Sequence, residues 1–398
     1  MHISQRFPHD LSPSELAQTL TNLSAHVVDL TVSNPTQVGF TYDEETLGEA
    51  FRAAAREPYQ PLPLGLPQAR HAISGYLQKT RNFHVPASRV IVTSSTSEAY
   101  SLLFKLLCNP NETIAVPVPS YPLVPHLAEL EAVKTVPYAW RFDQATLRWQ
   151  LDITSVEAAL KEHVRAVVAI SPNNPTGSIF SENECQALWQ LCRRYDVPLI
   201  ADEVFAPYTY QEGSSESLGQ DTAPGPLTFV LDGLSKAAGL PQLKLSWMTL
   251  FGESQAIEQA TLHLEWLMDA YLSVSGLVQH AAPTLLSLAI PMQQQIRRRL
   301  KAHWQVLASA IAPLSHVQLL PASGGFNAVL QLPEDWDEEA LVTHLACQHQ
   351  VLVQPGFFYD FQNGTFIVLS LLPEPDLFLR GVANLVTGLS QGRSSLTL

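Results

Sequence analysis

Short apolar runs alternate with longer helical patterns between residues 88 and 250 of the chain. β-Branched residues are frequent in these runs, and a turn-rich segment follows each of them. This alternation is typical of a mostly parallel sheet that is covered by helices. The predicted strands are Val90–Thr93, Thr113–Val118, Val164–Ile170, Val197–Ala201 and Leu227–Leu231.

Helical periodicity flanks this middle segment on both sides. The stretch Ala50–Tyr76 predicts helix around a proline-rich break, and Glu258–Leu288 and Gln293–Leu314 predict long helices. After them, Val317–Val386 mixes short strands with helices. The C-terminal part therefore predicts a smaller unit of mixed structure.

The length of 398 residues exceeds what one ordinary core accommodates. We predict an α/β protein whose large domain covers residues 45–290 and contains a mixed, mostly parallel sheet. Residues 1–44 together with residues 291–398 are predicted to form a smaller α+β domain. The sequence contains no internal repeat and no low-complexity tract that would indicate a different organisation.

Composition excludes several classes of partner. Hydrophobic residues make up 46% of the chain, but no stretch approaches the roughly 20 apolar residues of a membrane span. Residues 1–10 are polar and lack the apolar centre of a secretory signal, so we predict a cytoplasmic protein with no membrane partner. A net charge of −14 would repel a phosphate backbone, which argues against nucleic acid.

The cysteines and histidines do not form a metal pattern. The four cysteines lack CxxC spacing, which argues against a disulfide scaffold and a zinc site. The group His344, Cys347 and His349 fits no common zinc spacing, and a helix surface explains it better. We predict no metal.

Chemically useful side chains follow the predicted strands. In open α/β sheets ligands bind beyond the carboxyl ends of the strands, so these segments belong together. Ser94–Ser97 follows the first strand and precedes a helix that begins near Glu98, where free N–H groups and the helix dipole favour a phosphate. A simple Ser/Thr N-cap without ligand explains this motif equally well.

Each of the other four strand ends has an ordinary structural explanation when taken alone. Tyr121 is a ring that could stack on a planar ligand or serve packing, and Asn174 lies in a rigid proline turn. Asp202 could cap a helix, and Lys236 could be a solvated surface charge. Together, however, the five ends supply a phosphate cradle, a ring, an amide, a carboxylate and an amine. These are the groups that pyridoxal phosphate needs, with the amine forming a Schiff base and the carboxylate keeping the pyridine nitrogen protonated.

At this point the sequence resembles the fold-type I, class I/II aminotransferases, the family that includes aspartate aminotransferase, over nearly its whole length. The resemblance is carried by YQPLPLGLPQAR at Tyr59–Arg70, SSTSEA, PSY, NNPTG, DEVF and SKAAGLPQLK. The separations of 28 residues from Asn174 to Asp202 (202 − 174) and 34 from Asp202 to Lys236 (236 − 202) suit the family.

The resemblance implies a role for each matching residue. Lys236 is expected to form the internal aldimine with pyridoxal phosphate, and Asp202 to pair with the pyridinium. Asn174 is expected to donate to the phenolic oxygen of the ring and Tyr121 to stack on it. The phosphate is expected to meet Ser95, Thr96, Ser235 and Lys244, with Tyr59 reaching it from the partner in a homodimer.

Several positions depart from the family pattern. The phosphate-binding arginine expected eight residues after the lysine is Lys244, which keeps the charge but loses the bidentate fork. Phe205 replaces a tyrosine that would help Asn174 to hold the phenolic oxygen. The glycine of the phosphate cradle is Ser95, and the serine expected three residues before the lysine is Gly233.

The largest departure concerns the substrate. The family normally reads Arg-Leu-Ser where this chain has Val368-Leu369-Ser370, and that arginine clamps the substrate α-carboxylate. Since a buried carboxylate opposite a valine would be costly, Lys244, Arg70 or a partner residue could substitute, or the substrate is less charged there. Asn34, in a segment that resembles the substrate-contacting strand of the family, could donate to a neutral oxygen, although a turn asparagine explains it too.

The sequence predicts an aminotransferase that acts on a small-molecule amino donor and an oxo acceptor. A lyase or decarboxylase with the same cofactor is the main alternative, because the motifs do not determine which Cα bond breaks. The departures also leave a catalytically impaired relative open. A hydrolase acting through Ser235 is disfavoured because Ala237 occupies the position where the nucleophile elbow needs glycine.

Overall fold

The structure is a computed structural model of the whole chain. It describes residues 26–210, 217–219 and 225–391, together with 4, 6–7, 11–13 and 16–18 near the N-terminus. Most of the polar segment 1–10, which carried the prediction of a cytoplasmic protein, lies outside the described residues.

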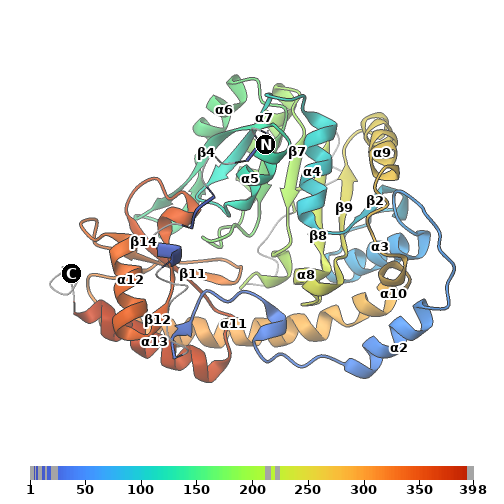
Figure 1. The fold of residues 1–398 in the computed structure, drawn as a ribbon. Coiled ribbons are helices and arrows are strands. Elements are labelled where there is room, and N and C mark those ends of the chain that lie inside the picture. Colours follow the sequence, from blue (N-terminus) through green and yellow to red (C-terminus); the bar gives the residue numbers. More distant parts are fainter. Residues whose placement is uncertain are drawn as a thin grey trace.

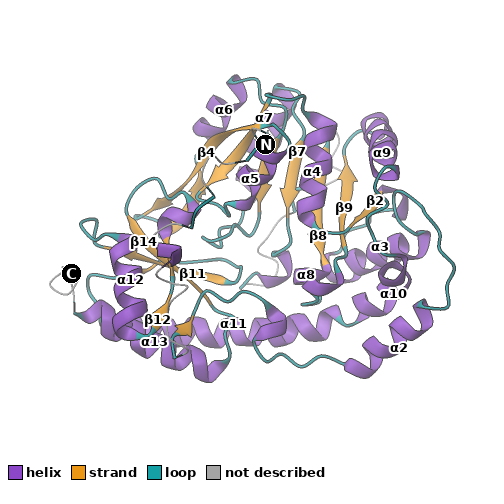
Figure 2. Ribbon diagram, viewed as in Figure 1, coloured by secondary structure: helices purple, strands orange, loops and turns teal. Residues whose placement is uncertain are grey.

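Among the described residues the strands form three sheets, of eight, four and two strands (Figures 1 and 2). The large sheet has the order β2-β9-β8-β7-β6-β3-β4-β5, and its five central strands, β8 to β4 in this order, are parallel. Its strands are β2 (Val90–Thr93), β3 (Thr113–Val118), β4 (Lys134–Asp143), β5 (Arg148–Leu151), β6 (Val167–Ile170), β7 (Leu199–Asp202), β8 (Thr228–Gly233) and β9 (Ser246–Phe251).

Helices cover both faces of the large sheet, as the alternating pattern predicts. Their apolar residues divide between two core clusters, one on each face. One face carries α4 (Thr96–Leu107), α5 (Leu123–Leu130) and α9 (Ser254–Asp269). The other carries α3 (Pro67–Arg81), α6 (Ile153–Lys161), α7 (Glu182–Arg194) and α10 (Gly276–Ser287).

The smaller four-stranded sheet is antiparallel, with the order β10-β11-β14-β13. Figure 1 shows the long helix α11 running from below the large sheet to this smaller one, where α12 and α13 cover it. The elements are β10 (Gln318–Leu319), β11 (Asn327–Leu332), β13 (Gln354–Pro355), β14 (Thr365–Ser370), α11 (Ala289–Ile311), α12 (Glu338–His349) and α13 (Pro375–Ser390). The two-stranded sheet pairs β1 (Val28–Asp29) with β12 (Val351–Leu352), and α2 (Glu44–Ala54) precedes α3.

The structure confirms the predicted class, and it corrects several boundaries. Glu258–Leu288 is two helices rather than one, because the chain leaves α9 after Asp269 and Leu272 adopts a positive φ of 47°. The strands β4, β5 and β9 were not predicted from the sequence. The first of these, β4, is hard to recognise because its side chains are mostly exposed or half-buried and no apolar run marks it.

Helix starts follow local capping chemistry. Ser181 and Glu184 form a capping box at the start of α7, and Asp43 accepts a hydrogen bond from the Thr46 N–H at the start of α2. Ser95 caps α4 in the same way. The cap residues therefore place the helix that follows the predicted phosphate segment directly after β2.

Candidate active site

The predicted site residues lie at one edge of the large sheet. The strands β3, β6, β7 and β8 are parallel, so their carboxyl ends meet at the same edge. Strand β2 runs in the same direction, because β9 is antiparallel to both β2 and β8. The tertiary structure thus brings the segments that carry Ser95, Tyr121, Asn174, Asp202 and Lys236 to a common edge.

Lys236 lies on α8 (Leu234–Ala237), the single helical turn that follows β8. Its Nζ is 5.3 Å from the centre of the Phe205 ring and 5.4 Å from that of Phe326. Burial lowers the pKa of this amine to about 8, against the opposing effect of the Asp202 carboxylate. The amine therefore loses its proton more readily than an exposed lysine, which a nucleophile requires.

Asp202 ends β7 and receives two hydrogen bonds. Tyr100 Oη donates to Oδ2 at 3.0 Å, and the Val204 N–H donates to Oδ1 at 3.3 Å. Burial raises the pKa of this carboxyl to about 6, while these two hydrogen bonds oppose the rise. Sequence reasoning missed Tyr100, whose position four residues after Thr96 places it one helical turn further along α4.

The Ser94–Ser97 segment forms the start of α4. Ser95 Oγ accepts a hydrogen bond from the Glu98 N–H at 3.1 Å, so the N-cap interpretation of this serine is correct. The Ser94 N–H donates to Glu98 Oε2 at 2.6 Å and is already used. The N–H groups of Thr96 and Ser97 make no hydrogen bond within the described residues, which leaves two donors for an anion.

The other residues expected near the phosphate differ in exposure. Ser235 is half-buried beside Lys236, whereas Lys244 is exposed. Lys244 follows the 3₁₀ turn Pro241–Leu243 and has a positive φ of 50°. Its ammonium group therefore extends from a turn that immediately precedes β9.

Asn174 is held by a residue that the sequence did not single out. Asn327 Nδ2, at the start of β11, donates to Asn174 Oδ1 at 2.7 Å. This hydrogen bond joins the small sheet to the turn after β6, and it leaves Asn174 Nδ2 as the available donor. Asn327 directly follows Gly324-Gly325-Phe326, and no pattern in that segment indicated a partner for Asn174.

Two aromatic residues expected to meet the cofactor are exposed in the single chain. Tyr121, beyond the end of β3, is 45% exposed, and Tyr59 is 76% exposed. Tyr121 lines a cavity of about 230 Å³ together with Asp360 and Gln362 of the C-terminal part. Its ring therefore lies where the large sheet and the small sheet meet.

The residues considered for substrate binding have different environments. Val368 is fully buried on β14, between Val329 of β11 and Gln354 of β13. Asn34 accepts from the backbone and the hydroxyl of Thr36, as a turn asparagine does. Arg70 donates to the carbonyls of Val90 and Ser88 at 2.7 and 2.9 Å. Because Val90 begins β2, Arg70 lies at the opposite end of the strands from the site. The prediction that Arg70 could bind the substrate carboxylate is therefore wrong within one chain.

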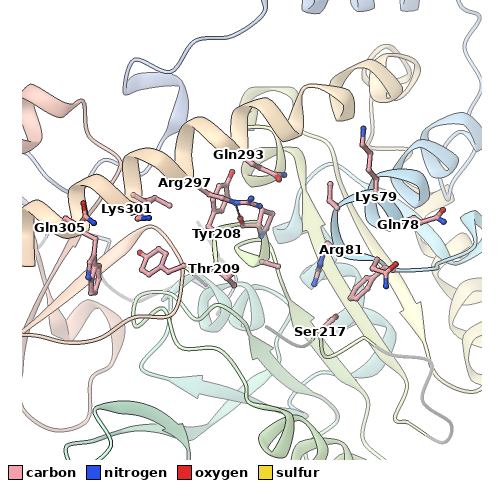
Figure 3. A pocket seen from close by; sticks show the side chains of 18 residues that line it. Gln78, Lys79, Arg81, Tyr208, Thr209, Ser217, Gln293, Arg297, Lys301 and Gln305 are labelled. Carbon is pink, nitrogen blue, oxygen red and sulfur yellow. Dashed lines mark hydrogen bonds between the residues drawn. The ribbon is translucent and has the colours of Figure 1, made fainter. Parts of the chain in front are cut away.

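A cavity of about 910 Å³ among the described residues lies away from this edge. Figure 3 shows it between α11 and the end of α3, with Arg297 and Gln293 on one side and Arg81 on the other. Tyr208 in its wall donates to the backbone carbonyl of Lys236 at 2.5 Å. The cavity thus lies behind the segment that carries the lysine, and the reactive side chains do not line it.

The chemistry of the donor set fits pyridoxal phosphate. A half-buried amine of lowered pKa, a carboxylate beside it and unpaired N–H groups at a helix start meet at one edge. No group of three or more His, Cys, Asp or Glu side chains placed to hold a metal occurs among the described residues. No helix in the described part of the chain is long and apolar enough to cross a membrane.

Comparisons with known proteins agree with this geometry. The family described as Aminotransferase class I and II matches residues 26–368. The glutamate-pyruvate aminotransferase AlaA of Haemophilus influenzae is 26% identical over 375 residues, which cover 92% of this chain and 91% of that protein. The alanine aminotransferase of Mycobacterium tuberculosis is 24% identical and covers 87% of this chain and 82% of its own length.

Solved structures show the same fold. The alanine aminotransferase from Pyrococcus furiosus matches with a TM-score of 0.84 at 22% identity, covering 92% of both chains. A double mutant of the Thermus thermophilus aspartate aminotransferase matches with a TM-score of 0.83 at 20% identity, covering 98% of this chain and 100% of that one. At these identities the structures establish the fold rather than the substrate.

Proposed function

This chain belongs to the class I and II aminotransferases, and from that premise we propose that Lys236 is the residue to which its cofactor is attached. The protein is an enzyme that uses pyridoxal phosphate and transfers an amino group between an amino compound and an oxo acid. The relatives named above are aminotransferases, which supports transfer over lyase or decarboxylase chemistry.

The single observation that carries the proposal is the environment of Lys236. When bound, pyridoxal phosphate supplies an electron-withdrawing ring that stabilises negative charge on the substrate Cα. Lys236 Nζ, with its pKa lowered to about 8, would be the amine that holds the cofactor and would afterwards accept or return a proton. Asp202, kept partly ionised by Tyr100 and the Val204 N–H, would pair with a protonated ring nitrogen.

The remaining residues orient the cofactor. Asn174 Nδ2 would donate to the phenolic oxygen, because Asn327 occupies Oδ1 of the same amide. Tyr121 would stack on the ring. Phosphate binding is assigned to Ser95 and Thr96 at the start of α4, to Ser235 and to Lys244.

The test is covalent capture of the cofactor. After incubation with pyridoxal phosphate and reduction with borohydride, Lys236 is expected to carry the label, and Lys236→Ala should lose it. Lys134→Ala is the control, because it removes an exposed lysine at the start of β4, at the opposite end of the strands from this site. Label on a different lysine in the native protein, or no uptake of cofactor, would refute the assignment.

We infer a substrate that is less charged than a common amino acid where it meets β14. Val368 is buried, and its cross-strand neighbours Val329 and Gln354 carry no charge. A carboxylate against this surface would lose its hydration without gaining a cationic partner. An amine, an amino sugar or another modified amino compound fits such a surface better than aspartate or glutamate.

A panel of half-reactions tests the substrate class. Mixing the loaded enzyme with amines, amino sugars and common amino acids, and following the absorbance change of the cofactor, should show the fastest reaction with the less charged compounds. Reaction with alanine, aspartate or glutamate at typical rates of roughly 1–10³ s⁻¹ would refute the inference. That outcome would mean that another residue binds the carboxylate.

We further infer a homodimer. Large apolar side chains are exposed on α9, on the segment after it and around Tyr59, namely Leu62, Leu262, Trp266, Tyr271, Leu272 and Leu277. Tyr59 and Leu272 line one shallow depression, so the two regions adjoin. A second copy of this chain is the proposed occupant of this surface. It would cover Tyr59, which is 76% exposed in the single chain, and would bring this tyrosine to the cofactor site of the partner.

We propose two domains and residence in the cytoplasm. A large domain at 45–290 is supported by the large sheet, whose strands lie between Val90 and Phe251. A small domain from 1–44 and 291–398 is supported by the four-stranded sheet between Gln318 and Ser370. The four cysteines are free thiols, which supports residence in the cytoplasm.

A further inference from the structure

Ser246 places a hydroxyl group between the two segments that hold the proposed cofactor site. It is the first residue of β9 and pairs with Thr93, the last residue of β2, and with Gly233, the last residue of β8. The start of α4 follows Thr93, and α8 with Lys236 follows Gly233. Ser246 therefore lies between the helix start that offers free N–H groups and the lysine.

Its side chain lies on the face of the sheet that α4 covers. Met248 and Leu250, two and four residues further along β9, pack in the same core cluster as Leu102 and Leu103 of α4. Since side chains alternate along a strand, Ser246 shares that face with Met248. The residue is only 3% exposed, and its Oγ makes no hydrogen bond with any other residue that the structure describes.

The hydroxyl occupies the space beside Gly233. A Cβ built on Gly233 would overlap Ser246 Oγ and would lie 2.8 Å from Ser246 Cβ. Position 233 is where the resemblance leads one to expect a serine, three residues before Lys236. Glycine at 233 and serine at 246 are therefore two parts of one arrangement, in which the hydroxyl comes from β9 rather than from β8.

We propose that Ser246 is a ligand of the cofactor phosphate and supplies the hydroxyl that position 233 lacks. This inference rests on the proposed cofactor site at Lys236. Ser246 Oγ donates to a phosphate oxygen beside the Thr96 and Ser97 N–H groups at the start of α4. This donor partly offsets the loss of the bidentate arginine at Lys244.

Cofactor titration of the apoenzyme tests the proposal. Ser246→Ala removes the hydroxyl and keeps Cβ, so it should raise the Kd for pyridoxal phosphate about tenfold, or about 1.4 kcal/mol. The Kd for pyridoxal, which has no phosphate, should not change. Thr249→Val is the matched control, because it removes a buried hydroxyl from the same strand away from the site edge.

Moving the hydroxyl gives a second test that does not depend on one variant. Gly233→Ser alone should disturb the site because its Cβ overlaps Ser246 Oγ. Gly233→Ser combined with Ser246→Gly relieves the overlap and should bind pyridoxal phosphate within about threefold of the native affinity. A folded double variant that binds as weakly as Ser246→Ala would contradict a phosphate oxygen at this place.

The outcomes separate this inference from the proposed function. If the native protein binds pyridoxal phosphate and Ser246→Ala binds it equally tightly, the role of Ser246 is refuted while the site stands. An equal loss of affinity for pyridoxal and pyridoxal phosphate would also refute it, because the phosphate would not be the group concerned. If the native protein takes up neither compound, the proposed cofactor site itself fails.

Discussion

At the scale of single residues, the ionisation of Asp202 depends on its burial and on the two hydrogen bonds that it accepts. Burial disfavours the ionised carboxylate, and the pKa of about 6 shows that the two hydrogen bonds only partly compensate. Tyr100 is buried, and its hydroxyl lies 3.0 Å from Asp202 Oδ2. This residue therefore sets the protonation of the group that is proposed to hold the ring nitrogen.

Tyr100→Phe should move the pH dependence of cofactor binding upward. Removing a hydrogen bond to an ionised group, worth about 1.5–3 kcal/mol, raises the pKa of Asp202 above its value of about 6. Affinity for pyridoxal phosphate, which needs the ionised carboxylate, falls as the pH drops through this pKa. In Tyr100→Phe the fall should therefore begin at a higher pH, by roughly one to two units.

The measurement is the Kd for pyridoxal phosphate between pH 5 and pH 8. Tyr138→Phe is a suitable control, since this buried tyrosine donates to the Val168 carbonyl at 2.7 Å rather than to a carboxylate. Identical pH profiles for the native protein and Tyr100→Phe would show that Tyr100 does not govern Asp202.

At the scale of elements, the inferred substrate class depends on β14 and its neighbours. Directly paired residues of an antiparallel sheet share a face, so Val368 lies beside Val329 and Gln354. Val329 and Val368 pack in the core cluster of the large sheet, whereas Ile367 and Leu369 pack in the cluster of the small one. Strand β14 thus directs Val368 toward the large sheet, and the element offers an apolar surface there.

Installing arginine on this strand should change specificity at the expense of stability. Val368→Arg is expected to speed the half-reaction with common amino acids, because a guanidinium can bind the α-carboxylate. It is also expected to lower Tm, since a larger charged side chain replaces a fully buried valine. Stopped-flow absorbance and thermal unfolding measure the two effects.

Val368→Leu serves as the control for the change in volume alone. It should lower Tm by less and leave the order of substrates unchanged. If Val368→Arg folds but gains no reactivity with amino acids, β14 does not face the substrate carboxylate.

At the scale of the whole molecule, the exposed apolar surface on α9 is the basis of the proposed dimer. Leu262 and Trp266 are 66% and 78% exposed, and their spacing of four residues puts them on one face of the helix. A large apolar surface of this kind is unfavourable in water, and a second copy would bury it.

Trp266→Asp should convert the proposed dimer to monomer. A carboxylate at the centre of an apolar interface would be desolvated without a partner. Light scattering coupled to size-exclusion chromatography would detect the change in mass, and cofactor affinity should fall because Tyr59 of the partner is lost. Leu130→Asp on α5 is the control, since Leu130 is 45% exposed away from this surface. A native protein that elutes as a monomer would refute the interface.

The sequence by itself determined the fold class and the groups at the strand ends. Alternating apolar runs and helical periods specify a parallel sheet with helices on both faces, and the residues after each strand are read directly from the chain. Lys236 and Asp202 could be proposed as one site because parallel strands send their carboxyl ends to the same edge. These features are local in sequence, so a single sequence contains them.

Only the tertiary structure decided which residues surround that site from a distance. Tyr100 on α4 contacts Asp202, Asn327 on β11 contacts Asn174, and Ser246 on β9 lies beside Gly233. No spacing along the chain links the members of these pairs. Strand β9 itself was not predicted, so its first residue could not be placed beside the lysine. Arg70 was misjudged for the same reason, because its two carbonyl partners lie at the far end of β2. Contacts between distant segments depend on how the whole sheet folds, and local patterns do not encode them.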